Sequence, residues 1–231
     1  MIDASSFALH HIAFWTDHAP TTEHFVRRIN LEHSERWSAP LDKPREKIRA
    51  AYVAELAFSR FCIRQSGIEE SAIAYLATLE AKKRLFPLLE NPSTLEDPLS
   101  KSEEGQVIHL ENSLQTFFKS RNMHIITRPI FYGCGYIDSS EGDILSGNCI
   151  FEVKTVDRPF RGGDIKQLIT YCALNHFSSQ FSLKNIGIFN PRRGTYFEMS
   201  LDKVSFEIAG KSKQELFDGI GHAISSGDIS R

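Results

Sequence analysis

The 231-residue sequence lacks the patterns that mark several common classes of protein. It contains no run of eighteen apolar residues, so a membrane span is not expected. Its N-terminus lacks the basic flank and apolar run of a secretion signal, and we expect a cytoplasmic protein. No C-x-x-C pair occurs, which argues against a zinc ribbon or a redox motif and favours reduced, mostly buried thiols. The cysteines are widely spread, at Cys62, Cys134, Cys149 and Cys172.

The sequence also lacks an excess of positive charge, since its formal net charge is -2. A protein that held DNA by its overall field alone would be basic, so any phosphate contacts must come from local groups of cations. These groups either contact phosphates or form ordinary solvated faces. They are Lys43, Arg45, Lys47 and Arg49; Arg158, Arg161 and Lys166; and Arg192 and Arg193. The phosphate-binding motif G-x-x-x-x-G-K-[ST] is absent, so any motor or specificity function must come from a partner protein.

The most informative stretch present is Gly142–Thr155, which predicts two short strands joined by a turn at Ser146-Gly147-Asn148. Side chains alternate between the two faces of a strand, so Glu152 and Lys154 are expected on one face. Asp143, on the neighbouring strand, can meet Glu152 across the ladder. Two carboxylates and an ammonium group at a sheet edge form a candidate site for Mg²⁺, beside which the lysine can orient or activate a water.

The surroundings of Glu152-Val153-Lys154 distinguish it from a chance match. An E-x-K triplet is expected about once by chance in a chain of this size, and Glu80-Ala81-Lys82 is a second example. That triplet lies in a helical run, where residues two apart do not share a face. By contrast, Glu152-Val153-Lys154 follows Asp143 in a strand context and precedes a predicted helix on which Gln167 and Tyr171 share a face.

In chain order, Asp143, Glu152-x-Lys154 and Gln167-x-x-x-Tyr171 resemble the motifs of the PD-(D/E)XK nuclease superfamily, and the last resembles its RecB-type branch. The resemblance implies a Mg²⁺- or Mn²⁺-dependent phosphodiesterase. In such an enzyme Asp143 and Glu152 bind the metal and Lys154 assists the attacking water. Gln167 and Tyr171 position the site or the nucleic-acid strand.

The resemblance covers about Gly105–Gly194 and has one plain departure, because Gly142 replaces the proline that gives the superfamily its name. That position varies in the superfamily. Some RecB-type nucleases carry an iron–sulfur cluster whose cysteines lie downstream of the Gln-x-x-x-Tyr helix. No cysteine follows Cys172, so no iron–sulfur cluster is expected here.

Two residues of the first core helix are candidates for a third metal ligand. Gly105–His109 resembles the RecB-type Gly-x-x-x-His signature, while Glu111 resembles the helical glutamate found elsewhere in the superfamily. At about 100° per residue, positions 109 and 111 diverge by roughly 200°, so they cannot easily serve together. Glu111 lies nearer the apolar face and ranks above His109. Glu111→Ala is therefore expected to abolish Mg²⁺-supported cleavage, with His109→Ala tolerated.

The fold expected from the elements is an α/β restriction-endonuclease-like core over residues 101–231. It has a mixed central sheet flanked by helices, preceded by a helical N-terminal extension over residues 1–100. Asp164 is expected to cap the Gln167 helix, Asp138 is a loop rival to Asp143, and Glu55 is either a functional acid or an ion-pair partner of Arg60 or Arg64. The elements expected are helices 44–67, 69–89, 104–121 and 213–225, a strand 124–132, a loop 155–163 and a hairpin 185–201.

The function implied is metal-dependent cleavage of nucleic acid, DNA rather than RNA, in defence against foreign DNA or in repair. Two other classes remain open. One is a catalytically silent nucleic-acid-binding or scaffolding subunit that keeps the fold, although the intact Asp143, Glu152 and Lys154 argue against lost chemistry. The other is a different metal enzyme built on the same carboxylates, such as a phosphatase.

Overall fold

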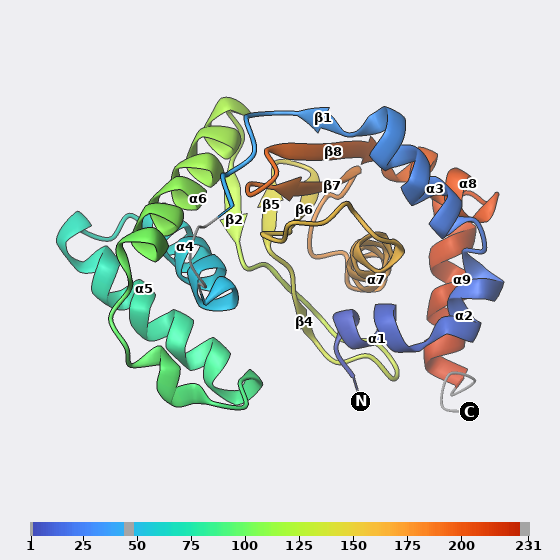
Figure 1. Ribbon diagram of the computed structural model, residues 1–231. Helices are drawn as coiled ribbons and strands as arrows, with labels where there is room; N and C mark the ends of the chain where they lie inside the picture. Colours follow the sequence, from blue (N-terminus) through green and yellow to red (C-terminus); the bar gives the residue numbers. More distant parts are fainter. Residues whose placement is uncertain (1, 44–48, 227–231) are drawn as a thin grey trace.

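Six short strands, all but β1 carrying β-branched or aromatic residues, form one mixed sheet at the centre of the molecule. The computed structural model describes residues 2–43 and 49–226 (Figure 1). The strands are β1 (Glu35–Arg36), β2 (Ile125–Thr127), β5 (Ile144–Ser146), β6 (Cys149–Val153), β7 (Asn185–Asn190) and β8 (Thr195–Ser200). Their spatial order is β1-β8-β7-β6-β5-β2, and every pair is antiparallel except β6 with β7. The predicted α/β class, with a mixed sheet flanked by helices, is confirmed.

The hairpin predicted around Ser146-Gly147-Asn148 is present. Ser146 pairs with Cys149 at its closed end, and Gly147 has a φ of +60°, a conformation that glycine adopts without steric cost. Because side chains alternate along β6, Ile150 and Glu152 face one layer of helices while Phe151 and Val153 face the other. One side of β6 therefore ends in the polar residue Glu152, whereas the other side is apolar at Phe151 and Val153.

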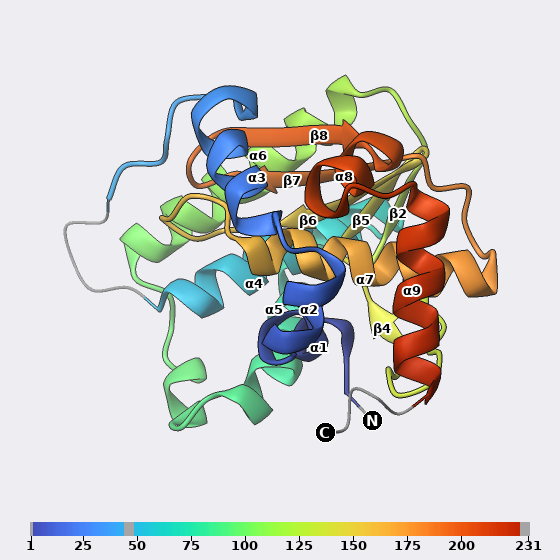
Figure 2. The ribbon, with the colours of Figure 1, turned by 90° about the vertical axis from the view of Figure 1, so that its right-hand side faces the viewer.

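One face of the sheet is covered by α7 (Gly162–Ser178), with five shorter helices packed around it (Figures 1 and 2). Ile150, Ile186 and Ile188 of the sheet pack here against the apolar side of α7. The surrounding helices are α1 (Ala4–His10), α2 (Ile12–His18), α3 (Thr22–Arg28), α8 (Leu201–Ala209) and α9 (Lys213–Ser226). The predicted helix 213–225 corresponds to α9, whereas α8 was not predicted.

The opposite face is covered by α6 (Lys101–Ser120), behind which pack α4 (Ala50–Gln65) and α5 (Glu70–Leu85). The contact is aromatic: the ring of Phe117 on α6 stacks on Phe189 at 4.0 Å and meets Phe151 edge to face at 5.8 Å. Such ring pairs stabilise a core beyond the area that they bury. They hold α6 firmly over the strands that carry the candidate site.

Residues 2–36 belong to the same core as the sheet, although the division expected at residue 100 placed them in a separate extension. Phe7, Trp15 and Phe25 of α1–α3 are buried with the residues of α7, and β1 extends the sheet by pairing with β8. Each of these helices has only seven residues, too few to be stable without tertiary packing. The sequence pattern of each one is therefore too short to predict its helix.

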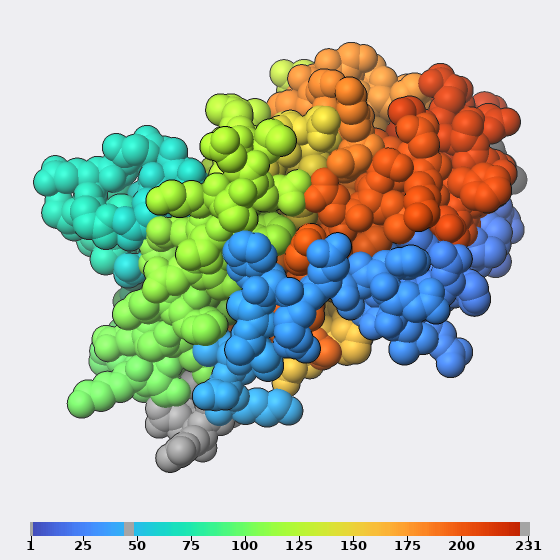
Figure 3. All heavy atoms as spheres, turned by 90° about the horizontal axis from the view of Figure 1, so that it is seen from above, coloured from blue at the N-terminus to red at the C-terminus, as the bar shows by residue number. Residues whose placement is uncertain are grey.

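The chain after β1 crosses from the α3 side towards α6, as Figure 3 shows in light blue. Trp37 N–H donates to the Gly194 carbonyl at 2.8 Å, and Leu41 N–H donates to the Arg192 carbonyl at 2.7 Å. The Trp37 ring meets Phe117 edge to face at 5.3 Å. This strap joins the N-terminal helices to the α4–α6 layer across the ends of β7 and β8.

Several element boundaries differ from the sequence expectation. The predicted strand 124–132 is split into β2 and β3 (Ile130–Phe131), because Arg128 has a left-handed φ of +52° and Pro129 follows it; β3 pairs with β4 (Ser140–Glu141). The 69–89 helix ends at Leu85 and continues as a 3₁₀ turn containing Pro87. A second 3₁₀ turn spans Pro92–Leu95. Residues 44–48, with Arg45, Lys47 and the expected start of the first helix, and the tail 227–231 lie outside the described residues.

The start of α6 three residues earlier than predicted is explained by a capping box. Ser100 Oγ accepts from Glu103 N–H at 3.2 Å, and Glu103 accepts in return from Ser100 N–H at 3.0 Å. The same carboxylate receives the Arg49 guanidinium, with Nη2 at 2.7 Å from Oε2. Glu103 thus fixes both the start of α6 and the segment that leads into α4.

The pKa of Glu103 is lowered from 4.5 to about 2, chiefly by the hydrogen bonds from Arg49. A lowered carboxyl pKa contributes stability that is complete above the unfolded-state pKa and lost as the pH falls through the folded-state pKa. We expect Glu103→Gln to lower the free energy of unfolding by about 2 kcal/mol at neutral pH, with the difference shrinking between about pH 4.5 and pH 2. Urea unfolding across this range, with the exposed neighbour Glu104→Gln as control, measures it. A difference independent of pH would contradict this cause.

The structure also bears on membrane insertion and on the state of the cysteines. Among the described residues, no helix is long and apolar enough to cross a membrane. The four cysteines are free thiols; Cys62, Cys149 and Cys172 are buried and Cys134 is half-buried, as predicted. Burial raises the pKa of Cys62 to about 12, so this thiol stays protonated and unreactive.

Candidate functional site

The β5–β6 hairpin brings Asp143 and Glu152 together. Ile144 pairs with Phe151, so the residue before β5 lies at the level of Glu152 on the neighbouring strand. Val153 N–H donates to Asp143 Oδ2 at 2.7 Å, which fixes the carboxylate against β6. The predicted meeting of the two acids across the ladder is therefore present in the structure.

This acidic pair is short of compensating partners. Glu152 is only 4% exposed, and its Oε2 atom has no hydrogen-bond partner within residues 2–43 and 49–226. Burial, and then the charge of Glu152, raise the pKa of Asp143 well above its usual value. A buried acceptor without a donor is costly, so a bound cation or water would stabilise this oxygen.

Lys154 lies just beyond β6 and faces the same side as Glu152, as the spacing predicted. Its Nζ atom is 2.7 Å from Glu152 Oε1, 3.3 Å from Gln167 Oε1 and 3.8 Å from Asp164 Oδ1. Burial acts to lower the pKa of Lys154, but the charge of Glu152 and the hydrogen bond to it outweigh burial and raise this pKa. Lys154 is therefore an ammonium group held between β6 and α7.

The predicted shared face of Gln167 and Tyr171 is also present. Gln167 Nε2 donates to the Tyr171 hydroxyl at 2.8 Å, and that hydroxyl donates to the Glu141 carbonyl at 2.9 Å. The Tyr171 ring is buried and stacks on Phe131 at 5.2 Å. A chain of hydrogen bonds thus runs from Lys154 through Gln167 and Tyr171 to the strand that precedes Asp143.

Tyr171→Phe is expected to impair the site and to lower the free energy of unfolding by about 1–3 kcal/mol, because it leaves Gln167 and the Glu141 carbonyl without a buried partner. Urea unfolding and initial cleavage rates at full folding measure the two effects separately. Unchanged stability would show that water replaces the hydroxyl.

Asp164 is a site residue whose role the sequence reasoning missed. Because α7 begins at Gly162, Asp164 is the third residue of the helix and not its N-cap; its Oδ2 accepts from Arg161 N–H at 2.9 Å. It is buried and faces Lys154 together with Gln167 and Tyr171. The spacing of 164, 167 and 171 is that of a single helical face and could have shown this.

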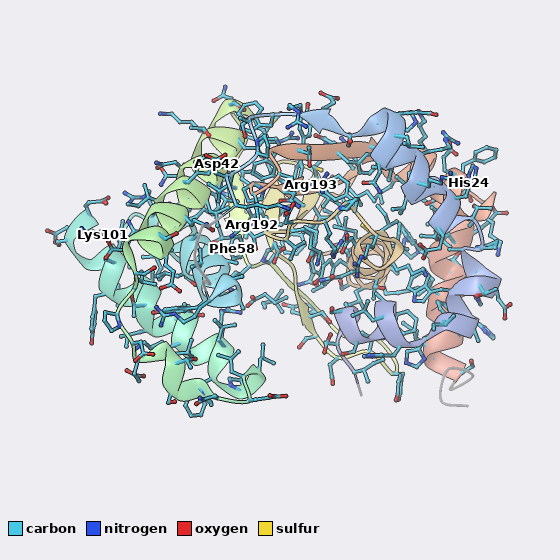
Figure 4. All side chains as sticks on the ribbon, in the orientation of Figure 1. His24, Asp42, Phe58, Lys101, Arg192 and Arg193 are labelled. Atoms are coloured by element: carbon cyan, nitrogen blue, oxygen red, sulfur yellow. The ribbon has the colours of Figure 1, made fainter. Side chains whose placement is uncertain are left out.

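The cations predicted to contact nucleic acid differ in their availability. Arg158 is held by Asp164 through two hydrogen bonds of 2.8 and 2.9 Å, so its guanidinium fixes the Asp164 carboxylate. Lys166 pairs with Glu23 at 3.2 Å, and Arg161 is exposed. Arg193, labelled in Figure 4, lies in the turn after β7. It approaches Asp157 at 4.0 Å. In the group that precedes α4, Lys43 pairs with Asp157 and Arg49 pairs with Glu103.

Arg192 stands apart because it is 9% exposed without a carboxylate partner among the described residues. Its Nε donates to the Thr155 carbonyl at 3.0 Å and its Nη1 to Gln106 Oε1 at 2.8 Å, while Nη2 has no partner in the described chain. Burial lowers its pKa, which expresses the cost of holding this charge out of water. Figure 4 labels it between α6 and the strand ends.

The structure does not bring Glu111 or His109 to the acidic pair, which corrects the expectation of a third ligand from α6. Glu111 does face inward and His109 outward, as the helical angles predicted. However, both Glu111 oxygens are held by guanidiniums of α4, Arg60 Nε at 2.5 Å and Arg64 Nε at 3.0 Å. A carboxylate paired in this way joins two helices instead of binding a metal.

Glu111→Gln is accordingly expected to act on stability. It should lower the free energy of unfolding by about 2 kcal/mol, because Arg60 and Arg64 are left without their shared carboxylate. The cleavage rate per folded molecule should stay within about twofold, with His109→Gln as the surface control on the same helix. Abolished cleavage in a fully folded Glu111→Gln protein would restore the role in metal binding.

A second ion-pair network, which the sequence did not reveal, ties α4 and α5 to the site. Arg128 bonds Glu55 Oε1 at 2.8 Å and Glu141 Oε1 at 3.2 Å, and its N–H donates to the Asp143 carbonyl. Arg84 of α5 bonds Glu141 at 2.8 Å. Glu55 therefore pairs with Arg128 and not with Arg60 or Arg64. Asp138, the rival to Asp143, donates its N–H to the Ile2 carbonyl near the N-terminus.

The donor set fits one hard divalent cation held by two carboxylates. Glu152 supplies an unpartnered buried oxygen, and Asp143 supplies a second carboxylate beside it. Within the described chain, no group of three His, Cys, Asp or Glu side chains is placed to hold a metal ion. Mg²⁺ usually keeps several waters and binds through one or two carboxylates plus substrate phosphate oxygens, which suits an acidic pair.

No protein-family model, curated protein or solved structure matches this chain.

Proposed function

We propose that this protein is a Mg²⁺- or Mn²⁺-dependent phosphodiesterase that hydrolyses nucleic acid, on a restriction-endonuclease-like core. The observation that carries the proposal is the buried pair Asp143 and Glu152, with Glu152 Oε2 unpartnered and Lys154 bonded to the other oxygen. The chain order of these residues, followed by Gln167 and Tyr171, supports the nuclease superfamily in its RecB-type form.

Asp143 and Glu152 would hold the cation, which when bound supplies positive charge against the negative charge that develops during phosphoryl transfer. Lys154 is placed to orient the attacking water and to offset charge on the phosphate oxygens. Gln167 holds Lys154 in position, and Tyr171 anchors Gln167 to the strand before Asp143. The site thus combines charge compensation with fixed orientation.

The proposed substrate is a nucleic-acid strand. The choice of DNA over RNA rests on the resemblance to the nuclease superfamily alone. Arg192 supports a polyanion because it is a buried cation with a free Nη2 at the strand ends, close to the residue after Lys154. A phosphate oxygen would satisfy this atom by a charge-assisted hydrogen bond. Further cations come from Arg161 and Lys166 at the start of α7 and from Arg193 in the turn between β7 and β8.

The chain carries no motif for nucleotide-driven motion, so a motor or specificity function would come from a partner protein. Defence against foreign DNA and repair are the two contexts proposed for such an enzyme.

The test is incubation of the protein with plasmid DNA, single-stranded DNA and RNA, with and without Mg²⁺ or Mn²⁺, beside the Glu152→Gln variant. Metal-dependent cleavage by the wild type alone is expected. Binding of nucleic acid without cleavage under any metal would support the silent subunit instead. Release of phosphate from a small phosphomonoester, with the polymers left intact, would identify a phosphatase.

A further inference from the structure

A groove of about 720 Å³ lies beside the first turn of α7, on the side away from Lys154. Its walls carry exposed aliphatic side chains, and Leu9, Ile12 and Leu31 are 58%, 71% and 73% exposed. Its rim carries the cations Arg27, Arg161 and Lys166. An apolar concave surface with a few polar groups at its edge, in this range of volume, is typical of a small-molecule site.

The groove is lined by more positively than negatively charged side chains, which favours binding of an anion. Three cations line it against one acid, Glu23. The Glu23 carboxylate reaches Lys166 Nζ at 3.2 Å and lies over Gly162, where a Cβ atom would come within 2.0 Å of its Oε1. Gly162 therefore leaves room for an acidic group over the start of α7, and Glu23 occupies it.

Glu23 holds this position weakly. Its side chain is 73% exposed, and an exposed ion pair contributes at most about 1 kcal/mol. A ligand phosphate carries more charge and could also reach Arg161 and Arg27, so it would displace the carboxylate from Lys166.

We propose that this groove binds one nucleotide of a single-stranded part of the substrate. Its phosphate replaces Glu23 on Lys166, and its base lies against Leu9, Ile12 and Leu31. This inference rests on the proposed function, whose substrate it specifies as single-stranded near the site. A base paired in a duplex is stacked on its neighbours, so only an unpaired base can enter an apolar groove.

The groove is linked to the candidate active site by one helical turn. Asp164 and Gln167 face Lys154, whereas Gly163 and Lys166 line the groove from the other side of α7. Asn30 fixes the opposite wall, since its side chain bonds both the N–H and the carbonyl of Phe160. A strand held here is therefore anchored to the element that positions Lys154.

The experiment is fluorescence anisotropy with a short labelled oligothymidylate in EDTA, where no cleavage occurs. Glu23→Gln is expected to tighten binding about threefold, because the competing carboxylate is lost. Arg161→Gln and Leu31→Asp are expected to weaken it about five- to tenfold. The matched controls are Glu32→Gln, Lys184→Gln and Leu88→Asp, which change exposed residues outside the groove and should bind as the wild type does.

Binding that is unchanged by all three groove variants, in a protein that still cleaves nucleic acid, would overturn the groove and leave the proposed function standing. A wild type that cleaves nothing would instead remove the proposed function itself. If the same variants alter binding to phosphatidylglycerol vesicles or to an acidic peptide but not to the oligonucleotide, the groove serves another partner and the proposal fails. Circular dichroism of each variant confirms that the fold is retained.

Discussion

Glu152→Gln is expected to reduce metal-supported cleavage at least about a thousandfold, since removing a metal ligand forfeits several kcal/mol of charge stabilisation. The buried Oε2 atom of Glu152 is an acceptor for which residues 2–43 and 49–226 provide no donor. Without metal, the same change should alter the thermal midpoint little, because relief of the repulsion with Asp143 is offset by loss of the ion pair with Lys154. A large loss of activity with little change in stability distinguishes a functional acid from a structural one.

The measurements are initial rates on a nucleic-acid substrate and thermal unfolding in EDTA, with Glu104→Gln as an exposed control. Equal cleavage by Glu152→Gln and the wild type would end the nuclease interpretation. A lowered midpoint with normal cleavage would assign Glu152 to packing.

Lys154→Met is expected to lower the rate of the chemical step about a hundredfold or more while Mn²⁺ binding is retained or tightened. The ammonium group is 2.7 Å from Glu152 Oε1 and competes with a cation for that carboxylate. Its loss therefore favours metal binding but removes the group that orients the attacking water.

Single-turnover cleavage and Mn²⁺ titration calorimetry separate these two effects, and Lys184→Met provides an exposed lysine control. A loss of Mn²⁺ affinity equal to the loss of rate would show instead that Lys154 acts only by arranging the acids.

The sequence predicted the core of the site because local rules determine it. Alternation along β6 places Glu152 and Lys154 on one face, and the turn at Gly147 sets the register that brings Asp143 opposite. Likewise, the four-residue spacing of Gln167 and Tyr171 is enough to place both on one side of α7. None of these relations needs knowledge of distant contacts.

Apart from the role of Asp164, which helical spacing alone could have shown, the relations that the sequence missed depend on packing or on an irregular backbone. Glu111 carries a carboxylate that could bind a metal, and it faces inward. The packing of α4 against α6, however, brings Arg60 and Arg64 into ion pairs with this carboxylate. The helices before residue 36 were not resolved from the pattern because each is short and gains its stability from α7 and β8. Arg128 could not be placed either, since its left-handed backbone breaks the expected strand.

The proposed metal site is tested most directly by anomalous X-ray diffraction from crystals soaked in Mn²⁺. A manganese peak is expected between the carboxylates of Asp143 and Glu152, within about 2.0–2.6 Å of an oxygen of each, and it should be lost in Glu152→Gln. Manganese bound elsewhere, with no peak at this pair in a protein that cleaves nucleic acid, would contradict the proposed site.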